Sequence, residues 1–157
     1  MKNRGYFKSP IGMMRIVEEE NFIVGLDFVQ DIENLDEDKE RNELIERTKR
    51  QLKEYFSGRR RDFALPVKLE GTDFQVKVWK ALQTIPYGET RSYGEIAKQI
   101  GNPKASRAIG NANHNNHLLL LVPCHRVIGA DGSLVGFGAG LDVKKYLLEL
   151  ERLQSIN

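Results

Sequence analysis

The chain has 157 residues, of which 40% are hydrophobic and 29% are charged, and its formal net charge is +2. This length fits one domain or two small ones, and no stretch approaches the roughly 20 apolar residues that a membrane-spanning helix needs. The N-terminus lacks the apolar run of a signal peptide. A single cysteine excludes an internal disulfide and a multi-cysteine zinc site. We therefore expect a cytoplasmic protein in a reducing environment, without membrane association.

The charge is unevenly distributed along the chain. Residues 1–56 contain 10 basic and 13 acidic side chains, whereas residues 57–157 contain 14 basic and 9 acidic ones. The second segment is therefore basic, which is compatible with a polyanionic partner such as nucleic acid. Many proteins with the same excess bind none, so the charge alone does not identify the partner.

The first thirty residues have the composition of an antiparallel meander. Residues 14–17 and 22–29 are rich in β-branched and aromatic side chains, which favour strands. The segment Ser9–Gly12 has turn composition, and the polar residues 18–21 separate the two predicted strands. Acidic residues 31–43 predict a loop or the approach to a helix.

A helix is predicted from about Glu40 to Phe56, because apolar side chains recur there at helical spacing and Gly58 supplies a stop. The arginines at 59–61 and Pro66 then mark a connector. A solvated loop is the favoured interpretation of the arginine triplet, and a phosphate contact is the alternative.

Short helices with clear start signals are predicted in the second part of the chain. Thr72–Gln75 and Ser92–Glu95 have the spacing of capping boxes, and Gly101 ends the second of these helices. Asn102–Pro103, interpreted as an N-cap and a first-turn proline, predicts a third helix over 104–112. The second and third helices form a helix-turn-helix candidate.

The third predicted helix is rich in small side chains and includes a glycine, which costs about 1 kcal/mol relative to alanine in a helix interior. Two interpretations stay open: close packing on another helix, or close approach to a DNA groove with Arg107 projecting from the helix. The small residues are Ala105, Ser106, Ala108, Gly110 and Ala112.

The only cysteine follows an apolar run that predicts a buried strand from Leu118 to Val122. The glycine-dense segment 134–140 predicts a loop whose backbone wraps a planar ligand. A last helix is predicted over 141–153. Its expected apolar face consists of Val143, Tyr146, Leu147, Leu150 and Leu153.

A lone cysteine is most often inert core filler, but the setting of Cys124 favours a nucleophile. A free thiol has a pKa near 8.5 and needs a base or a positive field to react. His125 is adjacent, but consecutive strand side chains point to opposite faces, so a direct bond needs a bend at Pro123 or a bridging water. Glu151 is a candidate to orient the imidazole, because an unpaired carboxylate beside an apolar face is costly.

A metal site formed by His114 and His117 with Cys124 and His125 is the weaker interpretation. The two histidines are three residues apart, but the chain has no Cys-x₂-Cys or His-Glu-x-x-His pattern. We expect no metal and no cofactor.

The segment Pro123-Cys124-His125-Arg126-Val127 resembles the signature of the O6-alkylguanine-DNA alkyltransferases. Upstream residues 92–116 and downstream residues 140–148 extend the likeness over about residues 72–153. The resemblance implies an α+β fold. A ribonuclease-H-like antiparallel sheet with a helix would occupy residues 1–68, and a mainly helical, winged-helix-like domain for DNA binding and alkyl transfer would occupy residues 69–157.

The same resemblance implies direct-reversal DNA repair by a monomer. The protein would flip a damaged nucleotide out of duplex DNA and move its alkyl group irreversibly to Cys124, once per molecule. O6-alkylguanine is the implied substrate, with O4-methylthymine as a second one. His125 would deprotonate Cys124 through a water, Glu151 would orient His125, and Lys144 would assist electrostatically.

Further roles are implied for residues outside the cysteine motif. Tyr93 would displace the nucleotide and donate a proton to the departing base, and Arg107 would fill the vacated space in the stack. Asn116 would couple the DNA-binding and active-site elements. Other implied DNA contacts are Ser106, Ala108, Gly110, Lys104 and Arg91, and the implied substrate pocket comprises Val127, Phe137, Gly138 and Trp79.

Some positions depart from the family pattern. His117 replaces the proline that usually follows Asn116, and Leu119 replaces a small residue or proline. Phe137 lacks the hydroxyl of the usual tyrosine, and Gly138 replaces a small polar residue. The cysteines of the zinc site that some relatives carry are absent.

Three alternatives remain at this point. An alkyltransferase-like protein would only flag lesions for another pathway, but such proteins replace the thiol that Cys124 supplies. A helix-turn-helix regulator would bind one sequence and dimerise. A cysteine hydrolase would need an oxyanion loop and a distant histidine, and neither is evident.

Overall fold

The computed structural model describes residues 1–30, 41–134 and 139–155. The chain divides into two compact units, Met1–Lys68 and Leu69–Asn157. Within the described ranges, no helix has both the length and the apolar character that crossing a membrane requires.

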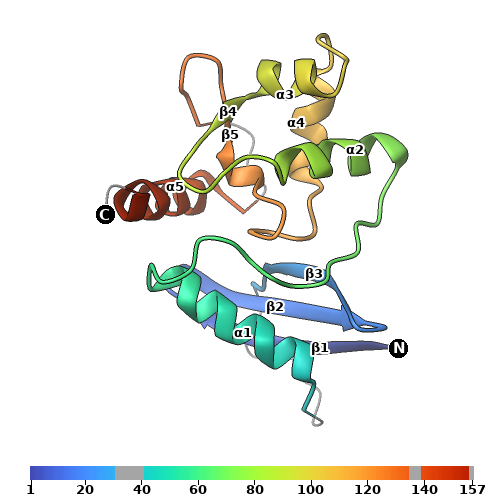
Figure 1. Ribbon diagram of the computed structural model, residues 1–157, viewed down its shortest axis with the longest axis vertical. Coiled ribbons are helices and arrows are strands. Elements are labelled where there is room, and N and C mark those ends of the chain that lie inside the picture. The colour runs from blue at the N-terminus through green and yellow to red at the C-terminus, as the bar shows by residue number, and fades with distance from the viewer. Residues whose placement is uncertain (31–40, 135–138, 156–157) are drawn as a thin grey trace. The chain divides into compact units, whose positions relative to one another are not determined.

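The first unit is built on a three-stranded antiparallel sheet of strand order β1-β2-β3 (Figure 1). Its strands are β1 (Lys2–Ser9), β2 (Gly12–Glu19) and β3 (Phe22–Phe28). Glu20 and Asn21 both have positive φ, 52° and 67°, as a two-residue type I′ hairpin requires. Every second side chain of β2 is buried, in keeping with the predicted meander.

Helix α1 (Glu43–Phe56) lies along one face of this sheet (Figure 1). It begins at Glu43 rather than near Glu40, because the Asn42 side chain accepts a hydrogen bond from the Ile45 amide at 3.0 Å and caps the helix. Gly5 of β1 permits close packing, since a Cβ there would collide with Ile45 Cγ2. The side chains of α1 that are buried are Ile45, Thr48, Gln51, Leu52 and Tyr55.

The connector after α1 is held to the same unit by two sets of hydrogen bonds. The Gln51 amide bonds to both backbone groups of Ala64, at 2.9 and 3.1 Å. Val67 pairs with Ile23 as an isolated bridge on the β3 side of the sheet. Arg60 of the arginine triplet binds Glu54 at 2.9 Å, so this arginine has a local partner.

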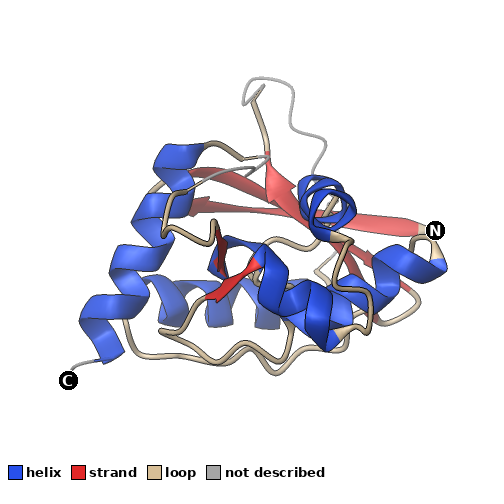
Figure 2. Cartoon of the chain, turned by 90° about the horizontal axis from the view of Figure 1, so that it is seen from above, coloured by secondary structure: helices blue, strands red, loops and turns tan. Residues whose placement is uncertain are grey.

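The second unit is mainly helical, and two very short strands lie among its helices (Figure 2). Its helices are α2 (Asp73–Leu82), α3 (Tyr93–Gln99), α4 (Ser106–His114) and α5 (Leu141–Ser155), with a 3-10 turn η1 (Cys124–Arg126). Strands β4 (Arg91–Ser92) and β5 (Val127–Ile128) pair in parallel. Both predicted capping boxes are present, helices α2, α3 and α4 pack on one another, and the α+β class is confirmed.

Two local predictions in this unit are wrong. Asn102 does not cap α4; its carbonyl accepts the Ala105 amide at 3.0 Å in a turn, and the helix begins at Ser106 and continues to His114. Residues 118–122 are buried as expected but form no strand. Leu120 has φ of 71°, and the Val122 amide donates to the Leu118 carbonyl at 2.8 Å, so the apolar run folds into a compact turn.

The buried face of α5 also differs from the prediction. Lys144, Leu147 and Glu151 are buried, at i, i+3 and i+7 spacing on one side of the helix. Tyr146 and Leu153, which were expected on the apolar face, are exposed. Two ionisable side chains therefore enter the interior of this unit, and both lie in the site described next.

Candidate active site

Cys124 lies at the start of η1, and the bend expected at Pro123 is present. Its amide donates to the Val122 carbonyl at 2.8 Å, and the Arg126 amide donates to the Pro123 carbonyl at 3.0 Å. The tight turn removes the strand geometry that would have sent the Cys124 and His125 side chains to opposite faces. The cysteine is only 2% exposed.

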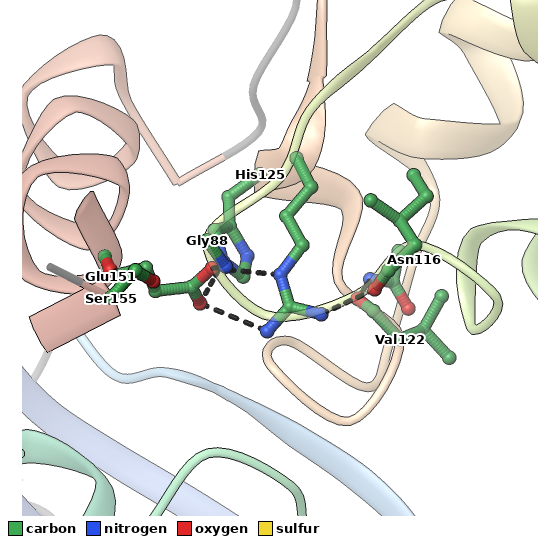
Figure 3. Close-up of polar contacts among 8 residues, drawn as sticks. Gly88, Asn116, Val122, His125, Glu151 and Ser155 are labelled. Carbon is green, nitrogen blue, oxygen red and sulfur yellow. Dashed lines mark hydrogen bonds and ion pairs between the residues drawn. The ribbon is translucent and has the colours of Figure 1, made fainter.

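Asn116 connects the end of α4 to the cysteine turn. Its Nδ2 donates to the Val122 carbonyl at 2.9 Å and lies 3.2 Å from Cys124 Sγ. Its Oδ1 accepts the Leu118 amide at 2.9 Å. Figure 3 shows this side chain beside Val122. A single amide thus fixes the compact turn and points a donor at the thiol.

A buried carboxylate lies on the other side of the turn (Figure 3). His125 Nε2 is 2.7 Å from Glu151 Oε2, and Arg126 binds both carboxylate oxygens, at 2.8 and 3.0 Å. The Gly88 amide also approaches Oε1, at 3.3 Å. The third arm of Arg126 donates to the Ile85 carbonyl at 2.7 Å. Glu151 therefore joins α5 to η1 and to the segment after α2.

These contacts determine the charge states of Glu151 and His125. Burial acts to raise the pKa of Glu151, but hydrogen bonds and charges from His125 and Arg126 outweigh it and hold that pKa well below its usual range. Burial lowers the pKa of His125, although the bond to Glu151 opposes the change. We therefore assign an ionised carboxylate and a neutral imidazole at pH 7.

The tautomer of His125 follows from these charges. An ionised carboxylate only accepts hydrogen bonds, so Nε2 carries the proton and donates it to Glu151. The other nitrogen, Nδ1, is buried and has no hydrogen-bond partner among the described residues. Its lone pair is therefore available to accept a proton, as a general base requires.

The thiol is subject to opposing influences. Burial raises the pKa of Cys124 to about 11, while the Asn116 hydrogen bond and the Lys144 charge act to lower it. Lys144 is itself buried, donates to the Val127 carbonyl at 2.5 Å, and has its pKa lowered to about 8 by burial. The resting sulfur is a protonated thiol, with a cation placed to stabilise its anion once the proton leaves.

Tyr93, the first residue of α3, lies near this thiol. Burial raises the pKa of the Tyr93 hydroxyl, the Asn113 amide acts to lower it, and Cys124 acts to raise it further. The phenol ring lies over Gly110 of α4, where a Cβ would be 3.8 Å from Tyr93 Cε1. Two residues named from sequence for the transfer, Tyr93 and Lys144, therefore lie close enough to Cys124 to interact with its charge.

Helix α4 has a buried face and an exposed face. The buried face fits the packing interpretation of its small residues, and the exposed face is compatible with the DNA-groove interpretation. Ala105, Ile109 and Ala112 are buried against the rest of the unit, whereas Arg107 and Ala108 are exposed. Of the other expected DNA contacts, Lys104 is exposed and Ser106, Gly110 and Arg91 are half-buried, with Arg91 bound to Glu89 at 3.1 Å.

The expected substrate-pocket residues are only partly described. Trp79 is buried between α2 and α4, where its indole donates to the Ala112 carbonyl at 3.0 Å and its ring contacts His117 edge-on. Val127 is buried in β5, and its carbonyl accepts from Lys144. Phe137 and Gly138 lie outside the described residues. Among residues 1–30, 41–134 and 139–155, no cluster of metal-ligating side chains occurs.

Sequence reasoning missed the role of Arg126. It was quoted only as part of the motif, yet it neutralises Glu151 and stacks its guanidinium over the Tyr87 ring at 5.7 Å. A signal was present, because a buried Glu151 facing a neutral histidine needs a cation, and Arg126 is the adjacent one.

The chain belongs to the 6-O-methylguanine DNA methyltransferase family. Residues 3–69 match the ribonuclease-like domain of that family, and residues 73–153 match its DNA binding domain. These two matches together span most of the chain.

Named relatives and solved structures agree with this assignment. The methylated-DNA–protein-cysteine methyltransferase of Methanosarcina acetivorans is 50% identical over 92% of this chain and 95% of that protein. The constitutive enzyme of Bacillus subtilis is 46% identical over 93% of each. The Mycobacterium tuberculosis O6-methylguanine methyltransferase structure superposes with a TM-score of 0.85 at 41% identity, covering 98% of this chain and 94% of that one. A structure of the M. tuberculosis OGT in complex with DNA gives 0.84 at 43%, covering 98% and 93%.

We predict that Glu151→Ala destabilises the protein by about 3–5 kcal/mol, because it leaves the Arg126 guanidinium buried without its counter-ion. Glu149→Ala on the same helix is the matched control, since Glu149 forms an exposed pair with Arg152 and its loss should leave the free energy of unfolding almost unchanged. Urea unfolding measures both variants. Equal, small effects would show that the buried cluster does not stabilise the fold.

Proposed function

We propose that this chain is a single-turnover DNA-repair alkyltransferase that moves an alkyl group from O6 of guanine in duplex DNA to Sγ of Cys124. Membership of the methyltransferase family supports the reaction class. One geometric observation carries the assignment of residues: Cys124 Sγ has a donor 3.2 Å away on Asn116, and it adjoins a histidine whose Nδ1 accepts protons because Glu151 binds Nε2.

These positions support the following reaction. His125 Nδ1 takes the thiol proton through a water, and the sulfur attacks the alkyl carbon. The new S–C bond forms as the C–O6 bond breaks, and the electron pair passes to the guanine ring, which receives a proton from the Tyr93 hydroxyl. Lys144 stabilises the sulfur anion during the transfer. A thioether is a stable product, so each molecule acts once and needs no cofactor.

The exposed face of α4 supports a role in extruding the damaged nucleotide. Flipping a base costs a few kcal/mol, so the protein needs a group to fill the vacated position. Arg107 is exposed on a helix whose outer surface is otherwise small at Ala108, which allows the backbone to approach a groove. Lys98 and Lys104 are exposed and suited to phosphates, whose recognition is independent of sequence.

The proposed chemistry assigns different functions to the two units. Every residue given a role in transfer lies in residues 69–157, so we assign DNA binding and alkyl transfer to that segment and a supporting role to residues 1–68. The same chemistry extends to O4-methylthymine, whose alkyl group is also bonded to an exocyclic oxygen. A reducing cytoplasm is the setting that keeps the acceptor thiol reduced.

Incubation with duplex DNA that contains O6-methylguanine should raise the protein mass by one methylene, confined to the peptide that contains Cys124. Intact-protein and peptide mass spectrometry measure the change, and Cys124→Ala should show none. An unchanged mass in the wild type with retained binding to the damaged duplex would contradict transfer and favour a protein that only flags the lesion.

The transfer rate should fall at both acidic and alkaline pH. His125 must be neutral, and its pKa lies below the ordinary 6.5, so activity should persist above that value and fall only at more acidic pH. Lys144 loses its charge as pH rises through about 8, so the wild-type rate should decline there.

Single-turnover rates from pH 5 to 9 test this profile. Lys144→Met should be slower below pH 8 and should lack the alkaline decline. The same decline in Lys144→Met would show that another group controls it.

Arg107→Ala should slow repair of duplex DNA by at least about tenfold, because the extruded base leaves a space that nothing fills, while the exposed position leaves the fold intact. Arg50→Ala removes an arginine that is also exposed, in the first unit, and serves as the control. With single-stranded substrate, Arg107→Ala should approach the wild-type rate. A lower thermal stability of Arg107→Ala would instead assign the arginine to packing.

A further inference from the structure

Asn113 is a buried amide whose hydrogen bonding is incomplete. It lies on α4 and is 4% exposed, and neither Nδ2 nor Oδ1 forms a hydrogen bond of standard geometry with a described residue. An unsatisfied buried amide costs stability, so such a group in a native protein needs an explanation. Neither the mechanism above nor the sequence motifs give Asn113 a role.

The position of Asn113 supplies the explanation. Gly110, one helical turn earlier on α4, lies under the Tyr93 ring, so both residues are on the side of the helix that faces Tyr93. The Asn113 amide is close enough to the Tyr93 hydroxyl to lower its pKa as a hydrogen-bond partner, and the charge of Cys124 acts on the same hydroxyl to raise it. The unused amide therefore lies within the cluster that contains the sulfur and the phenol.

We propose that Asn113 is a positioning residue that orients the Tyr93 hydroxyl by donating from Nδ2 to the phenol oxygen when the flipped base is bound. This inference rests on the proposed function, because it concerns the proton that Tyr93 gives to the departing guanine. The two side chains are already close, but the Asn113 amide does not reach standard hydrogen-bonding geometry in this structure, so it can tighten on the phenol oxygen in that state.

The chemistry explains why such a donor matters. As the S–C bond forms and the C–O6 bond breaks, the guanine receives the electron pair and takes the Tyr93 proton. A negative charge then develops on the phenol oxygen, in a site where burial opposes it. A hydrogen bond to that oxygen stabilises the charge until solvent returns a proton, while the thiol proton leaves through His125.

Asn113→Leu tests the proposal, because leucine is similar in size and lacks the amide. Single-turnover methyl transfer from saturating duplex with O6-methylguanine should slow by about fivefold to tenfold, the effect of losing one hydrogen bond in the transition state. The Kd for the duplex should be unchanged. The Tm should be equal or about 2–4 °C higher, because an unsatisfied buried amide has been removed. Asn113→Ala, which adds no bulk, serves as the second variant.

A double-mutant cycle with Tyr93→Phe separates positioning from packing. If Asn113 acts through the hydroxyl, Asn113→Leu should cause no further slowing in the Tyr93→Phe background. A ¹³Cζ-tyrosine NMR titration should also show that the pKa of Tyr93 rises in Asn113→Leu, since an influence that lowers it is lost.

Several outcomes would overturn the proposal. They are an unchanged rate in Asn113→Leu, the same slowing with and without the Tyr93 hydroxyl, or loss of the folded state in both Asn113 variants. Failure of the proposed function would look different. A wild-type protein that takes no methyl group onto Cys124 would contradict the function itself. Additive effects of the two substitutions in an active protein would contradict only the role of Asn113.

Discussion

The Glu151 carboxylate is 1% exposed and accepts hydrogen bonds from His125 and Arg126, with the Gly88 amide nearby. A charge so deeply buried is tolerable only when its partners are fixed, because removing one leaves the others unpaired in a medium of low dielectric. The arrangement therefore holds α5 against the cysteine turn. It also selects the proton position on His125, which decides whether the histidine can act as a base toward Cys124.

The site balances burial against charge. Burial alone makes Cys124 a poor nucleophile at neutral pH, since it raises the pKa of the thiol to about 11. Asn116 and Lys144 oppose that effect without abolishing it, so the resting sulfur stays protonated. In the proposed reaction, a protein that acts only once benefits from this state, because the sulfur would become reactive only when a proton acceptor and a substrate are in place together. Burying polar side chains such as Lys144 and Asn113 opposes folding, a cost that is common at functional sites.

Local signals in the sequence were enough to predict most of the elements. The capping boxes at Thr72 and Ser92 depend on residues three apart, and both helices begin where they indicate. The start of α4 was predicted wrongly, because Asn102 makes a turn with the same composition as a cap. The run 118–122 has the hydrophobicity of a strand but folds as a turn, and periodicity cannot separate the two in so short a segment.

The buried face of α5 shows a different limit. Hydrophobic periodicity selected Tyr146 and Leu153, but the interior receives Lys144 and Glu151, whose partners lie far away in the sequence. Glu151 was still found, because the cost of an unpaired carboxylate is a physical argument rather than a pattern. Arg126 and Asn113 were missed, since a counter-ion and a buried amide can be recognised only when the surrounding elements are in place.

The proton position on His125 is the most direct test of this account. Long-range ¹H–¹⁵N correlation NMR of ¹⁵N-labelled protein at pH 7 distinguishes the two neutral tautomers from the imidazolium, and His125→Gln assigns the signal among the three histidines of the chain. The account predicts a neutral ring protonated on Nε2. A proton on Nδ1, or a charged ring at that pH, would contradict it, because neither state leaves a lone pair on Nδ1 to accept the proton of Cys124.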